Sequence, residues 1–258
     1  MNVTISGTCL SGNCSKLVIS KNDSFALYVH DDSRAPIRVP LNIQNVLVEN
    51  HLVSLGTTPR VDVVEHLFSA LYGLNLFDVR IDVFGNEVPF FDGSSDPFVA
   101  MLHTININSL YNVLALDREI FVSERNSFIR YKPASEEQLF IEMELSHPYI
   151  RTQKIALDVT RENYINEIAP ARTFVFTDEN DPRLKNLPPF GIGVTQNRMY
   201  SATPLRFPNE LVRHKLLDLL GDIYIIRKKL VGNITCKNTS HRLNQKFIRE
   251  LEASWKKS

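Results

Sequence analysis

The strongest constraint in the sequence is a long stretch of helical periodicity between about residues 209 and 230. Within this stretch, apolar residues flank the polar residues on both sides, which is typical of a mostly buried helix. Within it, the segment RHKLLDLLGD places His214, Asp218 and Asp222 at intervals of four residues. All three side chains therefore share one helix face. Unpaired carboxylates in a buried position are costly, so the fold must bring a neutralising group to this face.

A metal ion is one group that would neutralise this face. An imidazole and a carboxylate four residues apart on a helix can bind the same ion, as histidine pairs do in zinc proteases. The alternative is a solvated helix face, on which His and Asp often occur at this spacing, and the helix by itself favours that alternative. The buried context shifts the balance towards a metal. A catalytic zinc site usually has three protein ligands and a water, so a third ligand must come from another segment.

Two other segments offer histidines. His66 follows Glu65 at the start of a predicted helix, where it could supply the third ligand beside a free carboxylate. The alternative is an ordinary charged first turn, in which Glu65 offsets the helix dipole. His241 follows a strand-like segment in the sequence NTSHRLN, and by itself it fits any surface loop. The residues alone leave these alternatives open.

Hydrophobic periodicity divides the chain into two similar halves. Residues 1–60 alternate short apolar runs with turn residues, residues 61–73 have helical spacing, and residues 78–84 alternate as a half-buried strand does. The second half repeats this order, with four strands and then a helical stretch over residues 119–168. We therefore predict an α+β fold with a boundary near residues 114–118.

The two predicted domains have different contents. The N-terminal domain, residues 1–115, carries the first predicted helix. The C-terminal domain, residues 116–258, carries the long helix and His241. Within it, residues 177–208 contain five prolines and should form a loop-rich insertion.

Charge and apolar patterning exclude several classes of function. Lys and Arg together number 29, as do Asp and Glu, so no net field attracts nucleic acid or an anionic membrane. No apolar run approaches the 18 residues that a membrane span needs, and the first residues lack the pattern of a secretory signal. We therefore expect a cytoplasmic protein without a membrane span, and its three cysteines should be reduced thiols.

Six segments, in this order and spacing, resemble a known family. They are VEHLFSAL from residue 64, NEVPFFDGSSDPFV from 86, SHPYIRTQ from 146, ARTF from 171, RHKLLDLLGD from 213 and SHRLN from 240. The chain resembles the bacterial UDP-3-O-acyl-N-acetylglucosamine deacetylases, the zinc amidases of lipid A synthesis. The segments span nearly the whole chain, and their joint order makes coincidence very unlikely.

The resemblance implies a fold and a metal centre. It implies two domains, each a β-sheet layered with α-helices, that face one another with the active site at their junction. The metal ligands would be His66, His214 and Asp218, and Glu65 would be the general base. The expected metal is Zn²⁺, although Fe²⁺ also suits imidazole and carboxylate ligands.

The resemblance also implies roles for the remaining site residues. His241 would be the general acid or a cationic stabiliser, and Asp222 would orient it. Thr173 would hold the reacting carbonyl, Phe174 would line the sugar site, and Lys215 would contact the substrate. That substrate would be a UDP-linked acylated N-acetylglucosamine, from which a monomeric enzyme releases acetate.

Three departures from the family pattern bear on the substrate. The usual stretch G-x-G-L-H-x-G near the N-terminus is replaced here by GTCLSG at residues 7–12, which lacks the histidine that lies near the substrate. The usual glycine before the last histidine is Ser240, and the insertion is short and rich in proline. The acyl-chain length and the exact sugar nucleotide are therefore left open.

Three alternatives to this assignment follow from the residues. The first is a metal-dependent amidase on the same scaffold that acts on a different N-acetylated sugar or sugar nucleotide. The second is a non-catalytic binding module with a structural zinc, but such sites usually have four ligands rich in Cys, and no cysteine lies near these residues in the sequence. The third is a purely structural role, in which the histidines are packed core residues.

Overall fold

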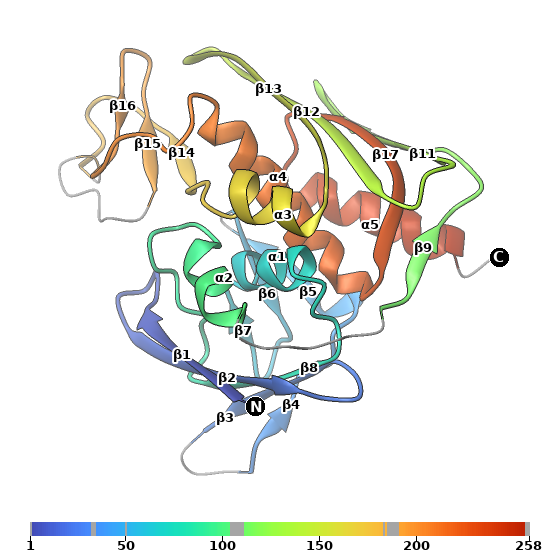
Figure 1. Ribbon diagram of the computed structural model, residues 1–258. Coiled ribbons are helices and arrows are strands. Elements are labelled where there is room, and N and C mark those ends of the chain that lie inside the picture. Colours follow the sequence, from blue (N-terminus) through green and yellow to red (C-terminus); the bar gives the residue numbers. More distant parts are fainter. Residues whose placement is uncertain are drawn as a thin grey trace.

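The computed structural model describes residues 2–31, 35–49, 51–103, 111–182, 184 and 191–255. It contains two large β-sheets with helices between them (Figure 1). This arrangement confirms the predicted α+β class. None of the helices in these described ranges is long and apolar enough to cross a membrane.

The first sheet is built from the N-terminal part of the chain. Its strands are β1 (Asn2–Thr8), β2 (Cys14–Lys21), β8 (Val79–Phe84), β3 (Ala26–His30) and β4 (Ile37–Arg38), in that spatial order. Alternate residues face the core, as Leu17 and Ile19 do on β2. The strand predicted at residues 78–84 is confirmed as β8.

A small second sheet connects this sheet to the first helices. Its strands are β5 (Val46–Glu49), β6 (Leu52–Leu55) and β7 (Val61–Asp62), and the short 3₁₀ turn η1 (Ile43–Asn45) precedes them. Helices α1 (Glu65–Gly73) and α2 (Asp96–Leu102) follow it. The helix predicted from residue 61 therefore begins later, because Val61 pairs with Leu55 in a strand and Val63 adopts a left-handed φ of 62°.

The second large sheet comes from the C-terminal part. Strands β10 (Ile120–Glu124), β11 (Ser127–Lys132), β17 (Lys229–Lys237), β12 (Leu139–His147) and β13 (Ile150–Asp158) lie in that order, and β9 (Val113–Ala115) pairs with β17. The four strands predicted over residues 119–159 are thus confirmed. A helical segment, α3 (Arg161–Asn163) with the π-helical turn η2 (Tyr164–Ile168), follows as predicted. The division into independent domains at residue 115 stays a prediction.

The long predicted helix is α4 (Glu210–Ile223), which continues into the 3₁₀ turn η4 (Tyr224–Ile226). The prediction that it reaches residue 230 is wrong. Arg227 has a left-handed φ of 52° and ends the helix, and β17 begins at Lys229. The last helix is α5 (His241–Trp255).

The segment predicted as a loop-rich insertion contains regular structure. Strands β15 (Ile192–Val194) and β16 (Met199–Tyr200) join β14 (Phe174–Phe176) in a three-stranded sheet that projects from the body of the protein (Figure 1). Within residues 191–208 only these two short strands are regular, held by the pairing of β15 with β14 and with β16, and the loop-rich insertion as such stays a prediction. Residues 183 and 185–190 of this segment lie outside the described residues.

Helices α1 and α4 pack against each other between the two large sheets (Figure 1). Every residue of α1 is buried, and one hydrophobic core includes residues from both halves of the chain. The helices approach so closely that a Cβ at Gly221 of α4 would lie 2.2 Å from the backbone oxygen of Glu65. Gly221 therefore sets the distance between the two helices that carry the predicted metal ligands.

We expect the substitution Gly221→Ala to destabilise the protein. Alanine favours a helix interior by up to about 1 kcal/mol over glycine, but the added methyl group meets a backbone atom, and such overpacking costs about 1–3 kcal/mol or more. Urea unfolding should show a lower midpoint. The exposed position Glu250 on α5 is the control, since Glu250→Ala should change stability by less than about 0.5 kcal/mol. A stabilised Gly221→Ala variant would contradict the close packing.

Candidate metal centre

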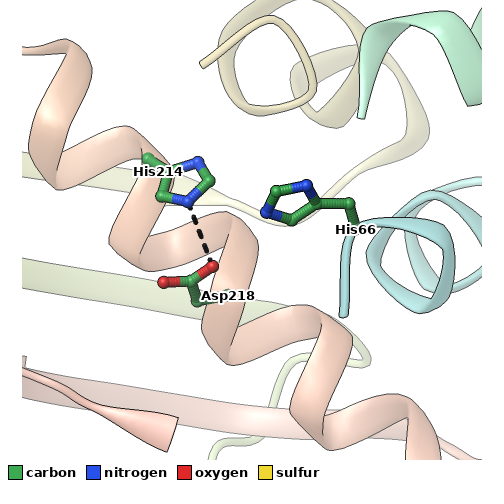
Figure 2. A group of neighbouring side chains, drawn as sticks. All are labelled: His66, His214 and Asp218. Carbon is green, nitrogen blue, oxygen red and sulfur yellow. Dashed lines mark ion pairs between the residues drawn. The ribbon is translucent and has the colours of Figure 1, made fainter. Parts of the chain in front are cut away.

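Three predicted ligands meet at the contact between α1 and α4. One potential ligand atom from each of His66, His214 and Asp218 lies within 4.8 Å of the others, and all three residues are buried. His214 and Asp218 are one turn apart on α4, with 3.2 Å between Nε2 and Oδ1. His66 reaches them from α1, and one of its ring nitrogens points towards the pair (Figure 2). The structure thus brings together side chains almost 150 residues apart in the sequence.

The donor set fits a divalent metal ion. The Nδ1 of His214 lies 3.1 Å from the backbone oxygen of Ala171, which leaves Nε2 free to face Asp218. Such a second contact fixes the tautomer of a ligating histidine. Burial, followed by repulsion from His214, lowers the pKa of His66 to about 3 and keeps its imidazole neutral. Two imidazoles and a carboxylate are ligands that zinc accepts.

The carboxylate of Asp218 is held in its charged form. Burial by itself would raise its pKa, but the positive charge of Lys215 and the two neighbouring histidines, His214 and His241, hold the pKa well below its usual value. The Nζ of Lys215 lies 2.8 Å from Asp218 Oδ2. This ion pair neutralises part of the carboxylate charge on the helix face.

Glu65 lies at the start of α1 beside the three potential ligands. Its Oε2 accepts a hydrogen bond from the backbone N–H of Val53 at 3.2 Å. Burial raises the pKa of Glu65 to about 8, although the charge of His241 opposes the shift. A carboxyl group with a pKa near neutrality can both accept and return a proton.

His241 and Asp222 form a buried pair. His241 Nδ1 lies 2.8 Å from Asp222 Oδ2, and its Nε2 lies 3.9 Å from Asp218 Oδ2. The side-chain amides of Asn244 and Gln245 also donate to Asp222, at 2.8 and 3.3 Å. Burial opposes protonation, but the two carboxylates raise the pKa of His241 to about 9. The imidazole is therefore a cation at neutral pH.

These side chains surround a pocket of about 400 Å³. Eight of the nine predicted site residues line it, and Asp222 lies behind His241. Both halves of the chain contribute to its walls. The nine residues are therefore brought together as expected, while the role of each remains to be tested.

Sequence reasoning missed several residues that line the pocket. His51 and Leu52 reach it from the β5–β6 hairpin, and Thr239 lines it just before His241. His147 and Phe176 form a stacked pair with ring centroids 3.6 Å apart. The segment SHPYIRTQ indicated the place of His147 but not its contact. No local pattern indicated the hairpin residues, because only the fold brings them to α1.

A buried ion pair holds the segment around Thr173 against α4. Arg172 is 1% exposed and donates to both carboxylate oxygens of Glu210, at 2.8 and 3.1 Å. It also donates to Ser201, Thr203 and the backbone of Pro204. Glu210 lies one turn before His214, so the pair links the pocket wall to the helix that carries two potential ligands.

We expect Glu210→Ala to destabilise the protein by about 3–5 kcal/mol, because it leaves Arg172 buried without its carboxylate. Burial would raise the pKa of Glu210, but Arg172 holds that pKa below its ordinary value of 4.5. The stabilisation from the ion pair is therefore complete when the pH is well above 4.5, and it is lost as the pH falls through the lower pKa that Glu210 has in the folded protein. Urea unfolding between pH 3.5 and 7 measures both effects.

The matched control is Glu167→Ala, which removes a half-exposed carboxylate that pairs with Arg213. Its cost should be below about 1 kcal/mol. Equal losses for the two variants would contradict the importance of the buried pair.

Comparison with known proteins matches this chain to one family. The family model described as UDP-3-O-acyl N-acetylglycosamine deacetylase matches residues 2–253. The UDP-3-O-acyl-N-acetylglucosamine deacetylase of Campylobacter hominis is 36% identical over 196 residues, which cover 72% of this chain and 67% of the relative. The enzyme of the same name from Sulfurimonas denitrificans is 31% identical over 250 residues, 93% of this chain and 85% of the relative. The enzyme of that name from Myxococcus xanthus is 29% identical over 236 residues, 87% of this chain and 75% of the relative.

Proposed function

We propose a function from the premise that this chain belongs to the UDP-3-O-acyl N-acetylglycosamine deacetylase family. The protein hydrolyses the N-acetyl group of UDP-3-O-acyl-N-acetylglucosamine and releases acetate. This reaction belongs to lipid A biosynthesis. The observation that carries the proposal is the convergence of His66, His214 and Asp218 beside Glu65 in one pocket. The family match confirms the resemblance found in the sequence.

His66, His214 and Asp218 would hold a divalent metal ion, and we propose that this ion is Zn²⁺. Fe²⁺ suits the same ligands. When bound, such an ion lowers the pKa of a coordinated water to about 7 and polarises the acetamide carbonyl. The carboxylate of Asp218, the neutral ring of His66 and the imidazole of His214 provide the ligand types for it.

The remaining residues would handle protons and charge. Glu65 would accept the proton of the attacking water, since it lines the same pocket as the proposed ligands His66, His214 and Asp218. The hydroxyl of Thr173 and the cation of His241 line the same pocket, where they would stabilise the oxyanion that develops on the acetamide. The departing amine would receive its proton either from His241 or from Glu65.

Lys215 and Phe174 would contact the sugar nucleotide. The Nζ of Lys215 lies 5.3 Å from the ring centroid of Phe174, at the wall of the pocket. An ammonium group can bind a phosphate as a point charge, and an aromatic ring can cover a sugar face. Apolar residues of the same pocket, among them Leu145 and Phe176, are suited to the acyl chain. The monomeric state and the cytoplasmic location stay predictions.

A second candidate is a deacetylase of the same mechanism that acts on another N-acetylated sugar nucleotide. The observation that favours it is the absence of a histidine from residues 7–12, where the family pattern has one near the substrate. Assays with UDP-3-O-acyl-N-acetylglucosamine and with unacylated UDP-N-acetylglucosamine separate the two. Higher kcat/KM on the unacylated compound would favour the second candidate.

We expect His214→Ala and Glu65→Gln to separate metal binding from proton transfer. His214→Ala removes a ligand, so bound metal and deacetylation should be lost together. Glu65→Gln should retain the metal but lose roughly 10²- to 10⁴-fold in kcat, because a positioned base contributes about that much. Elemental analysis and acetate release measure the two properties. Equal metal loss in both variants would contradict the role proposed for Glu65.

We expect Asp222→Asn to shift the pH dependence of the reaction. The Asp222 carboxylate is the largest influence that raises the pKa of His241 to about 9, so its removal should lower that pKa. If the reaction needs protonated His241, the decline of kcat/KM at high pH should begin at a lower pH than in the unaltered protein. Glu142→Gln, at an exposed position of β12, is the control. An unchanged profile with Asp222→Asn would refute the pairing.

A further inference from the structure

The small sheet of β5, β6 and β7 lies beside the first turn of α1 (Figure 1). Val53 on β6 makes two contacts with that turn. Its N–H donates to Glu65 Oε2 at 3.2 Å, and its carbonyl oxygen accepts from the N–H of Val64 at 3.1 Å. Strand β6 therefore holds both the side chain of Glu65 and the backbone that precedes it.

Four polar side chains link the three strands of this sheet, and we call them the polar clamp: Glu49, Ser54, Arg60 and Asp62. Arg60 donates to Glu49 Oε2 at 2.9 Å, to Ser54 Oγ at 3.0 Å and to Asp62 Oδ1. Ser54 donates in turn to Asp62 Oδ1 at 2.6 Å. The polar clamp thus fixes β6 relative to β7. Strand β6 holds the Glu65 carboxylate, and β7 leads into Glu65.

The connection from β7 to α1 is short and conformationally unusual. Val63 has a φ of 62°, a left-handed conformation that is rare for a β-branched residue. Such a conformation persists only where the surrounding structure determines it. Here Asp62 is held through backbone bonds to Asn86 and Val88, at 2.9 and 3.0 Å, and Val64 is held by Val53. A small shift of β7 relative to β6 would therefore turn the first residues of α1.

We infer that the polar clamp positions Glu65 for proton transfer, and that Arg60 and Ser54 are positioning residues of the reaction. The inference rests on the proposed role of Glu65 as the proton acceptor. Proton transfer requires heavy atoms within about 2.6–3.2 Å of each other. A misplacement of about 1 Å can reduce a rate by roughly 10²-fold. A clamp outside the pocket can thus control turnover without a contact to the substrate.

The exposure of Arg60 and Glu49 distinguishes a positioning role of the polar clamp from a purely stabilising one. The side chains of Arg60 and Glu49 are 35% and 59% exposed. Exposed ion pairs contribute little to stability. Loss of Arg60 should therefore leave the protein folded and reveal its effect on Glu65. Ser54, by contrast, is only 1% exposed, so Ser54→Ala offers a second and smaller change at the buried end of the polar clamp.

The first experiment measures the kinetics of Arg60→Met in the full-length, metal-loaded protein. The expected result is a fall in kcat of roughly tenfold or more, with KM within about twofold and metal content unchanged. Arg60→Lys should give an intermediate kcat, because an ammonium cannot reproduce the fork of contacts. An unchanged kcat for both Arg60→Met and Ser54→Ala would overturn the inference.

The matched control is Arg80→Met on β8. Arg80 also contacts the aspartate two residues later, with both Nε and Nη2 within 2.7 Å of Asp82, but it lies on the other sheet. Its loss should leave kcat unchanged. A similar fall in both arginine variants would show a general effect of charge removal and would overturn the inference.

The second experiment tests whether Arg60 acts through Glu65. In a Glu65→Ala background, Arg60→Met should reduce the residual kcat by less than about twofold, because no carboxylate remains to be positioned. The same tenfold loss in that background would overturn the inference. If Glu65→Ala alone leaves activity intact, the proposed function of Glu65 fails instead.

Amide hydrogen exchange gives a readout that does not depend on activity. Arg60→Met should speed the exchange of residues 51–56, including the Val53 amide, by roughly tenfold, whereas Arg80→Met should not. Unchanged exchange rates in Arg60→Met would overturn the inference that the polar clamp holds β6 in place, even where the unaltered protein is an active deacetylase. Faster exchange with no deacetylase activity in the unaltered protein would support the clamp and refute the proposed function.

Discussion

The site depends on the close approach of α1 and α4. Gly221 allows the backbone of α4 to pass against the backbone of Glu65, with no side chain between them. This contact places the first turn of α1, with Glu65 and His66, opposite the face of α4 that carries His214 and Asp218. A larger separation would leave the potential ligands too far apart to share one ion, since zinc–ligand distances are only about 2.0–2.3 Å.

The same approach creates an electrostatic problem that the pocket resolves with paired charges. Asp218 and Asp222 are both buried on α4, where isolated carboxylates would be costly. Lys215 pairs with Asp218, and His241 with two amides of α5 surrounds Asp222. As a result, the pocket contains a histidine that favours its cation beside a glutamate whose pKa lies near neutrality. A cationic imidazole can donate a proton, and a carboxyl group with a pKa near the working pH can accept and return one.

Structures outside the pocket keep these groups in place. Arg172 and Glu210 connect the segment of Thr173 to the first turn of α4. Arg206 contacts Asp92 and the backbone of Pro170, so it joins a loop of the N-terminal half to the C-terminal half. The polar clamp of β5, β6 and β7 holds the start of α1.

Local sequence patterns were sufficient where structure is local. The spacing of His214 and Asp218 determines that they share a helix face, and alternation in residues 78–84 determines a strand, because side-chain direction follows from the period of the backbone. Together with the segments shared with a known family, these patterns placed the nine candidate residues.

Only the tertiary structure decided how distant segments meet. It ended the helical segment of α4 and η4 at Arg227, paired β15 with β14 and with β16, and brought Val53 to Glu65 and His51 to the pocket. None of these contacts has a local signature, because each depends on backbone groups or on the separation of packed helices. The sequence therefore determined which side chains each helix presents. Packing determined which of them share a site, since His66 and His214 can meet only after two helices far apart in the chain have come together.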